Sequence, residues 1–127
     1  MKRSLALGLT LLSGVAIGAT AIQGLHAQAK PPTYVVVAIR SVSDADSYRP
    51  VIEKAPALIK EGGGTFLVRS NDIISLDGTP PKRFVLLQFD SAEKAQAWYN
   101  MPGMKELNAI RAKSTDSLAF IVQGVAN

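Results

Sequence analysis

The sequence contains no cysteine and only one histidine, His26. The lack of cysteine excludes disulfides, a thiolate nucleophile and a zinc–thiolate site. His26 lies in an N-terminal segment that we expect to be removed, so the mature chain would carry no imidazole. That absence excludes serine–histidine catalysis and histidine-ligated haem. We therefore expect no cofactor.

Metal binding would have to rely on carboxylates, because they are the only strong ligands left in the mature chain. Asp44 and Asp46 form the only closely spaced pair. An Asp-x-Asp directly before a helix is typical of a helix cap and a solvated turn. We therefore expect no dedicated metal site.

Residues 1–29 have the three-part layout of a secretory signal peptide. Lys2 and Arg3 precede a stretch without charge, and Ala27-Gln28-Ala29 forms a small-x-small cleavage site. An uncleaved anchor is the alternative, since the apolar run approaches the roughly 17–20 residues that can span a bilayer. We predict cleavage after Ala29, export to the periplasm or beyond, and no membrane attachment of the mature chain.

Removal of this segment also changes the charge of the protein. The net charge of +4 falls to +2 without Lys2 and Arg3, which leaves 12 basic and 10 acidic residues. So small an excess is weak support for a polyanionic partner. The stretch Lys82–Leu87 also lacks the glycines of the motif by which RNA-binding sheets display aromatic rings. We expect no nucleic-acid partner.

We expect most apolar residues of the rest of the chain to pack on the stretch from Lys82 to Tyr99. Phe84–Phe89 is short and apolar on both faces, which is typical of a strand buried on both faces of its sheet. The spacing of Asp90 and Glu93 predicts a capping box for the helix that follows, with Ser91 as the competing cap. That helix presents an apolar side that would lie on the sheet.

Further strands and helices are indicated by apolar periodicity and by the capping, glycine and proline residues that bound them. We predict strands at 34–39, 65–70 and 118–123, helices at 45–60 and 103–113, and a short arm at 73–76. Pro56 is expected to kink or break the first helix. Residues 30–127 would form a single domain.

The order strand, helix, strand, strand, helix, strand predicts an α+β fold of the ferredoxin-like βαββαβ type. Its four-stranded antiparallel sheet carries the helices on one face. Three of the strands, however, are apolar on both faces. Because a bare apolar sheet face is unusual for a monomer, we predict a homodimer that packs through this face.

Several segments together resemble one known family. In chain order they are Tyr34–Val37, Tyr48, Gly63–Arg69, Asp77-Gly78, Arg83–Phe89, Ser91–Tyr99 and Arg111. Their order and spacing resemble the family catalogued as domain of unknown function 1330, in the dimeric α+β barrel superfamily. The chain departs from that pattern at Ser70-Asn71 and at Pro102–Met104. The resemblance implies the barrel dimer and no established reaction.

The candidate site residues are two arginines and three aromatic residues. Strict alternation would place Arg69 on the same sheet face as Leu67. A buried cation needs a carboxylate, a ligand anion or water, whereas a rim arginine leaves its head in solvent. Arg111 poses the same choice, with Asp116 as a possible partner. The ring side chains that would form the core or line a cleft are Tyr48, Trp98 and Tyr99.

Three hypotheses for function follow. The first is a binding protein that holds a small apolar or aromatic acid between sheet and helices, against Arg69. The second is a cofactor-free enzyme, an isomerase or an oxygenase, with Tyr48 or a carboxylate as acid or base. The third is a structural or partner-binding protein without a pocket.

Overall fold

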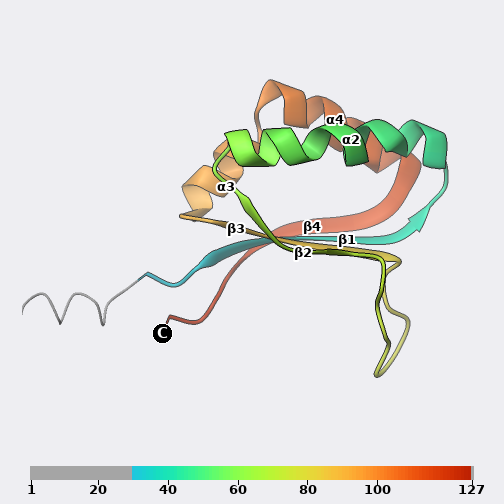
Figure 1. Ribbon diagram of the computed structural model, residues 1–127, viewed down its shortest axis with the longest axis horizontal. Helices are drawn as coiled ribbons and strands as arrows, with labels where there is room; N and C mark the ends of the chain where they lie inside the picture. The colour runs from blue at the N-terminus through green and yellow to red at the C-terminus, as the bar shows by residue number, and fades with distance from the viewer. Residues whose placement is uncertain (1–29, 127) are drawn as a thin grey trace, which may run out of the picture. The chain divides into compact units, whose positions relative to one another are not determined.

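Four strands form one antiparallel sheet in the order β2-β3-β1-β4 in the computed structural model, which describes residues 30–126 (Figure 1). They are β1 (Thr33–Val42), β2 (Thr65–Ser70), β3 (Arg83–Phe89) and β4 (Thr115–Gln123). β1 and β3 are the central strands, which agrees with their β-branched and aromatic composition.

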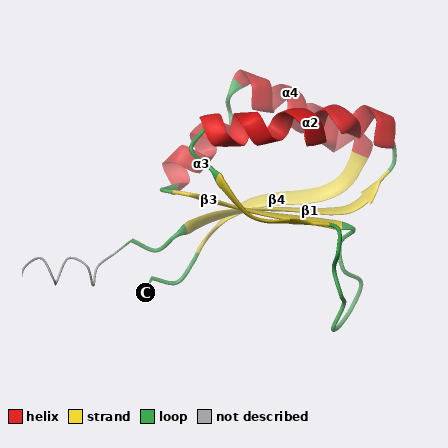
Figure 2. Cartoon of the chain, in the orientation of Figure 1, coloured by secondary structure: helices red, strands yellow, loops and turns green. Residues whose placement is uncertain are grey.

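Three helices cover one face of this sheet and leave the other face open (Figure 2). They are α2 (Ala45–Glu61), α3 (Ala92–Tyr99) and α4 (Pro102–Ser114). The predicted ferredoxin-like fold is therefore confirmed. Pro102 separates α3 from α4 and occupies the first turn of α4, where its missing N–H costs nothing.

Asp44 caps α2, as is typical of an Asp-x-Asp directly before a helix. Its carboxylate accepts hydrogen bonds from the backbone N–H of Ser47 at 3.1 Å and from the Ser47 hydroxyl at 2.7 Å. These bonds lower the pKa of Asp44. The helix continues through Pro56 to Glu61, so the predicted break at Pro56 does not occur.

The capping box predicted for α3 is wrong. Ser91 is the cap, and its hydroxyl accepts from the backbone N–H of Lys94 at 3.1 Å. The helix therefore begins one residue later than a cap at Asp90 would require. The Asp90 carboxylate instead lies 3.5 Å from the Lys94 ammonium on the exposed side of the helix.

The core lies between the sheet and the three helices. Ile39 and Leu87, on the two central strands, are almost completely buried. Trp98 of α3 is also buried, and its ring centroid lies 5.2 Å from that of Phe89. This pair fixes α3 against β3, as the sequence of that strand–helix unit predicts.

The opposite face of the sheet is apolar, and no helix of residues 30–126 lies on it. Register pairs place one side chain from each strand together on this face, for example Leu86, Val36 and Phe120. Further apolar members of this face are Tyr34, Ala38, Phe84, Leu118 and Val122. Phe120 is 47% exposed and Leu118 is 45% exposed, so the prediction that strands are apolar on both faces is confirmed.

The connection between β2 and β3 projects from the sheet on the side away from the helices (Figure 1). The backbone N–H of Lys82 donates to the Ile39 carbonyl at 2.8 Å, and this bond holds the C-terminal end of the connection beside β1. Ile74 is 85% exposed and Leu76 is 99% exposed. The arm thus extends apolar surface on the same side as the open sheet face.

The predicted signal peptide, with His26, lies outside the described residues. Cleavage after Ala29 stays a prediction, which N-terminal sequencing of the mature protein would test. Within residues 30–126, no helix is long and apolar enough to cross a bilayer.

We expect Gly62→Ala to destabilise the fold. A Cβ atom at Gly62 would lie 2.7 Å from Cδ1 and 2.8 Å from Cβ of Trp98. Such overpacking of a core ring costs about 1–3 kcal/mol of unfolding free energy, which urea denaturation would measure.

Gly103→Ala is the matched control. Its Cβ would meet only the flexible end of Leu58, at 3.1 Å, and Gly103 lies in the first turn of α4 without a positive φ, so alanine fits its backbone conformation. Equal stability losses in the two variants would contradict the role assigned to the contact between Gly62 and Trp98.

Candidate functional site

A pocket lies between the helix-facing side of the sheet and the helices. Its volume is about 70 Å³. Its floor is apolar, built by Val37, Val85 and Leu87 of the two central strands. This lining, an apolar floor with polar side chains around it, suits a small ligand with one apolar end.

All five residues that the sequence singled out line this pocket. They come from four elements and are Tyr48 (α2), Arg69 (β2), Trp98 and Tyr99 (α3) and Arg111 (α4). The fold therefore brings together, at one place, residues that are up to 63 positions apart in the chain.

Arg69 reaches the pocket because of an irregularity in β2. The register shifts between Phe66 and Val68, so that Phe66 pairs with Leu87 and Arg69 pairs with Val85. Both partners are buried on the helix-facing side. Arg69 therefore shares a face with Phe66 rather than with Leu67, which corrects the prediction from strict alternation. Its guanidinium carbon lies 4.5 Å from the centroid of the Phe66 ring.

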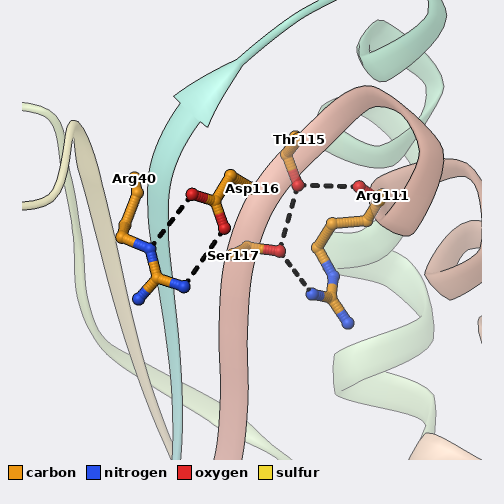
Figure 3. Close-up of polar contacts among 5 residues, drawn as sticks. All are labelled: Arg40, Arg111, Thr115, Asp116 and Ser117. Carbon is orange, nitrogen blue, oxygen red and sulfur yellow. Dashed lines mark hydrogen bonds and ion pairs between the residues drawn. The ribbon is translucent and has the colours of Figure 1, made fainter.

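Arg111 is held in place where α4 joins β4 (Figure 3). It donates from Nη1 to the Ser117 hydroxyl at 2.8 Å and from Nη2 to the Tyr99 hydroxyl at 3.3 Å. The Thr115 hydroxyl donates to the Arg111 carbonyl at 2.7 Å and lies 3.0 Å from the Ser117 hydroxyl. All of these partners are neutral, so they fix the guanidinium without cancelling its charge.

Asp116 is not the partner of Arg111, contrary to the prediction. Its two carboxylate oxygens accept from Nε and Nη2 of Arg40, at 3.2 and 3.1 Å (Figure 3). The alternation of β4 explains this outcome, because Asp116 and Ser117 point to opposite faces of the sheet. The carboxylate pairs on the open face, and Arg111 stays on the pocket side.

Sequence reasoning missed two polar residues of the pocket, Arg83 and Asn108. Arg83 donates from Nη1 to the Asn71 side-chain oxygen at 3.0 Å. It alternates with Val85 and Leu87, which is a signal that it faces the core side. Asn108 follows the buried Met104 by four residues on α4, a spacing that places both on one side of the helix.

Tyr48 lies in the pocket wall near two of these arginines. It is 6% exposed, and this burial raises the pKa of its phenol. The positive charges of Arg83 and Arg111 act in the opposite direction and offset only part of the rise in pKa. Tyr48 is therefore protonated at neutral pH and can donate a hydrogen bond.

Among residues 30–126, three arginines line the pocket, Arg69, Arg83 and Arg111, and no carboxylate does. The two other arginines of residues 30–126 do have carboxylate partners: Arg40 pairs with Asp116, and Arg49 pairs with Asp46 at 2.8 Å. The two arginines outside the pocket are thus balanced by carboxylates, whereas the three that line it are not. Such a site favours an anionic ligand.

A second hollow lies on the other side of Trp98, between α3 and β4. Its volume is about 270 Å³, and its polar residues are Gln96, Tyr99 and Asn100. It is the larger of the two, but no charged side chain of residues 30–126 lines it. The buried indole N–H of Trp98 has no acceptor among residues 30–126 and could serve a ligand or a water molecule.

Comparison with known protein families decides the classification. The profile of the domain of unknown function DUF1330 matches residues 32–125. The chain belongs to this family. The match covers every element of the DUF1330 fold described above, from β1 to β4. A search of curated protein sequences gives no match.

Solved structures with similar folds share little sequence with the DUF1330 chain. A protein of unknown function from Rhodopseudomonas palustris matches with a TM-score of 0.63 and 12% identity, over 77% of this chain and 85% of that one. An Arabidopsis thaliana protein matches with a TM-score of 0.57 and 18% identity, over 77% and 91%. SnoaB, a cofactor-independent oxygenase from Streptomyces nogalater, matches with a TM-score of 0.53 and 10% identity, over 76% and 96%. At these identities the likeness establishes the fold alone.

The raised pKa of Tyr48 predicts a stability effect at alkaline pH. The unfolded chain loses the tyrosine proton near pH 10, before the folded chain does, so the free energy of unfolding falls as the pH rises above about 10. Tyr48→Phe removes this contribution. Urea denaturation at about pH 7 and about pH 11 should show a smaller alkaline loss in the variant than in the parent. An identical loss in both proteins would contradict the assignment.

Proposed function

We propose that this protein binds a small organic anion with an apolar body in the pocket between the sheet and the helices. The observation that carries the proposal is that three arginines, and no carboxylate of residues 30–126, line a pocket with an apolar floor. An anion would satisfy the unbalanced charge, and the apolar floor would take the rest of the ligand.

The ligand would enter from the mouth beside Arg69. Of the three arginines, Arg69 is the exposed one, whereas Arg83 and Arg111 are partly buried. The two inner guanidiniums attract an anion more strongly than exposed ones would, because solvent screens them less. Tyr48 adds a neutral donor on the same wall.

The single tryptophan of the chain, Trp98, lines the pocket and supplies a direct probe of binding. We expect benzoate to change the fluorescence of Trp98 in a saturable way and benzyl alcohol, which has the same ring without the charge, to bind at least about tenfold more weakly. Arg111→Gln should weaken benzoate binding by about 10–100-fold, because it removes a charge-assisted contact.

Arg40→Gln is the matched control, since Arg40 lies on the open face and pairs with Asp116. It should leave the affinity for benzoate unchanged. Equal binding of benzoate and benzyl alcohol, or equal weakening by the two substitutions, would contradict an anion site at Arg111.

We also propose that two copies associate through the open face of the sheet. That face carries exposed leucine, phenylalanine and valine side chains on β4, and none of the three helices covers it. Two-fold packing would bury the same surface of both copies and remove a patch that is unusual for a monomer. The ion pair between Arg40 and Asp116 would lie at the polar rim of such an interface.

Phe120→Glu tests this association. In a face-to-face dimer the new carboxylate would be buried without a partner, at a cost of several kcal/mol. We expect light scattering to give a dimer mass for the parent and a monomer mass for the variant. Ala57→Glu, at an exposed position of α2, should remain dimeric. A monomeric parent at micromolar concentration would contradict the proposal.

A cofactor-free enzyme remains the second candidate, supported by the likeness of the fold to SnoaB. All ten carboxylates of the chain are exposed, and none lines the pocket, so no carboxylate is placed to act as a base there. Tyr48 is left as a proton donor and Arg69 as a partner for an oxyanion. Recovery of every bound ligand unchanged after long incubation in air would exclude this candidate. The open pocket argues against the third hypothesis, a protein without a ligand site.

A further inference from the structure

The β2–β3 connection, residues 71–82, carries the two most exposed large apolar side chains among residues 30–126, Ile74 and Leu76. Leu76 is almost completely exposed, so its side chain packs against nothing in its own chain. An apolar side chain of this size gains free energy when another surface removes it from water. Two of them on one projecting segment indicate a contact with a second molecule.

Hydrogen bonds hold this connection in one shape. The Ser75 hydroxyl donates to the Gly78 carbonyl at 2.6 Å and closes the tip. At the base, Nη1 of Arg83 donates to the side-chain oxygen of Asn71 at 3.0 Å. Pro80-Pro81 further restricts the backbone on the way back to β3. A segment that is already ordered loses little conformational entropy when it binds a partner.

The charges around the two apolar side chains favour a protein partner over a lipid surface. Asp72 and Asp77 flank them, and the single basic residue of the connection, Lys82, lies at its base. Segments that insert into membranes combine apolar residues with lysine or arginine, which anionic lipids attract. Two aspartates beside Ile74 and Leu76 would be repelled by such lipids.

The size of the open sheet face indicates which protein partner the connection meets. Strands of 6–10 residues at about 3.3 Å per residue, in a sheet of four strands about 4.8 Å apart, give this face a footprint of about 500 Å². Two such faces packed together would bury about 1,000 Å², whereas stable specific interfaces bury about 1,200–2,000 Å². The sheet faces alone therefore form a small interface.

The connection can supply the missing area, because it projects beyond the open face on the side away from the helices (Figure 1). In a face-to-face pair it would run past the sheet of the second copy. Ile74 and Leu76 of both copies would add about 100 Å² each, about 400 Å² together, and bring the interface within the usual range.

We propose that the β2–β3 connection of each copy clasps a second copy of this chain, with Ile74 and Leu76 buried against it at the margin of the sheet interface. This inference rests on the proposed association through the open face, because it adds a second contact region to that dimer. The partner is a second copy because the segment and the open face lie on the same side of the molecule.

The dissociation constant of the dimer, measured by analytical ultracentrifugation over a dilution series, tests the contact. The double variant Ile74→Ser/Leu76→Ser should raise this constant at least about 100-fold, since each side chain is buried once in each copy. Ile52→Ser is the matched control, because Ile52 is an exposed isoleucine of α2 on the helix side. It should leave the constant unchanged.

A dye at position 76 reports the contact directly. Because the chain contains no cysteine, Leu76→Cys provides a single attachment point for a polarity-sensitive dye such as acrylodan. We expect the dye emission to shift to shorter wavelength as the protein concentration rises through the dimer range. The same dye on Ala57→Cys, at an exposed position of α2, should show no shift. Adding Phe120→Glu to Leu76→Cys should abolish it.

The outcomes separate this inference from the proposed association. A dimeric parent in which the dye at position 76 stays in water, or in which the double variant and Ile52→Ser have the same dissociation constant, would overturn the clasp and leave the association through the open face intact. A monomeric parent would overturn both. A shift that needs phosphatidylcholine–phosphatidylglycerol vesicles and ignores protein concentration would overturn the clasp in favour of a membrane contact.

Discussion

Three guanidinium groups face a pocket that supplies no carboxylate to neutralise them. Unpaired positive charge beside apolar side chains costs free energy, and a fold retains it only where water or a ligand compensates. The contrast inside the same chain makes the point sharper, because Arg40 and Arg49 on the outer surface each have an aspartate partner. The account of this protein as an anion-binding module depends on that difference.

The ferredoxin-like arrangement explains how the charges converge. Helices cover one face of the sheet, so alternate residues of β2 and β3 and one side of α2, α3 and α4 all point into the same layer. Most of that layer is filled by core side chains such as Leu87 and Trp98. Near the ends of β2, β3 and α4 polar side chains replace them and the layer opens. The opposite face of the sheet is not covered by the three helices, and in the proposed dimer a second copy would cover it.

Much of this could be predicted from the sequence. Short β-branched runs such as Tyr34–Ile39 and helical spacing after Asp44 predicted the element order, and with it the fold. All five predicted site residues line one pocket, because large aromatic and arginine side chains within core-facing periodicities have few other places to lie. The position of Arg83 in the pocket could have been predicted by the same argument, because Arg83 alternates with Val85 and Leu87 along the strand.

The errors arose where tertiary pairing changes a local rule. The irregularity between Phe66 and Val68 shifts Arg69 onto the face of Phe66, and only the register with β3 reveals it. Asp116 is separated from Arg111 by the alternation of β4, whose first residues the sequence did not assign to a strand. Ser91 and Asp90 both satisfy cap preferences, so the local sequence does not distinguish them, and in the structure Ser91 is the cap.

Crystals soaked in bromide would test the central claim most directly, through the anomalous scattering of the ion. Bromide reports where a small anion settles without help from an organic body. The account predicts a strong anomalous peak inside the pocket, within contact of Arg83, Arg111 and Tyr48. Peaks confined to the outer surface, with the pocket arginines found on carboxylates or stacked away from the cavity, would contradict it.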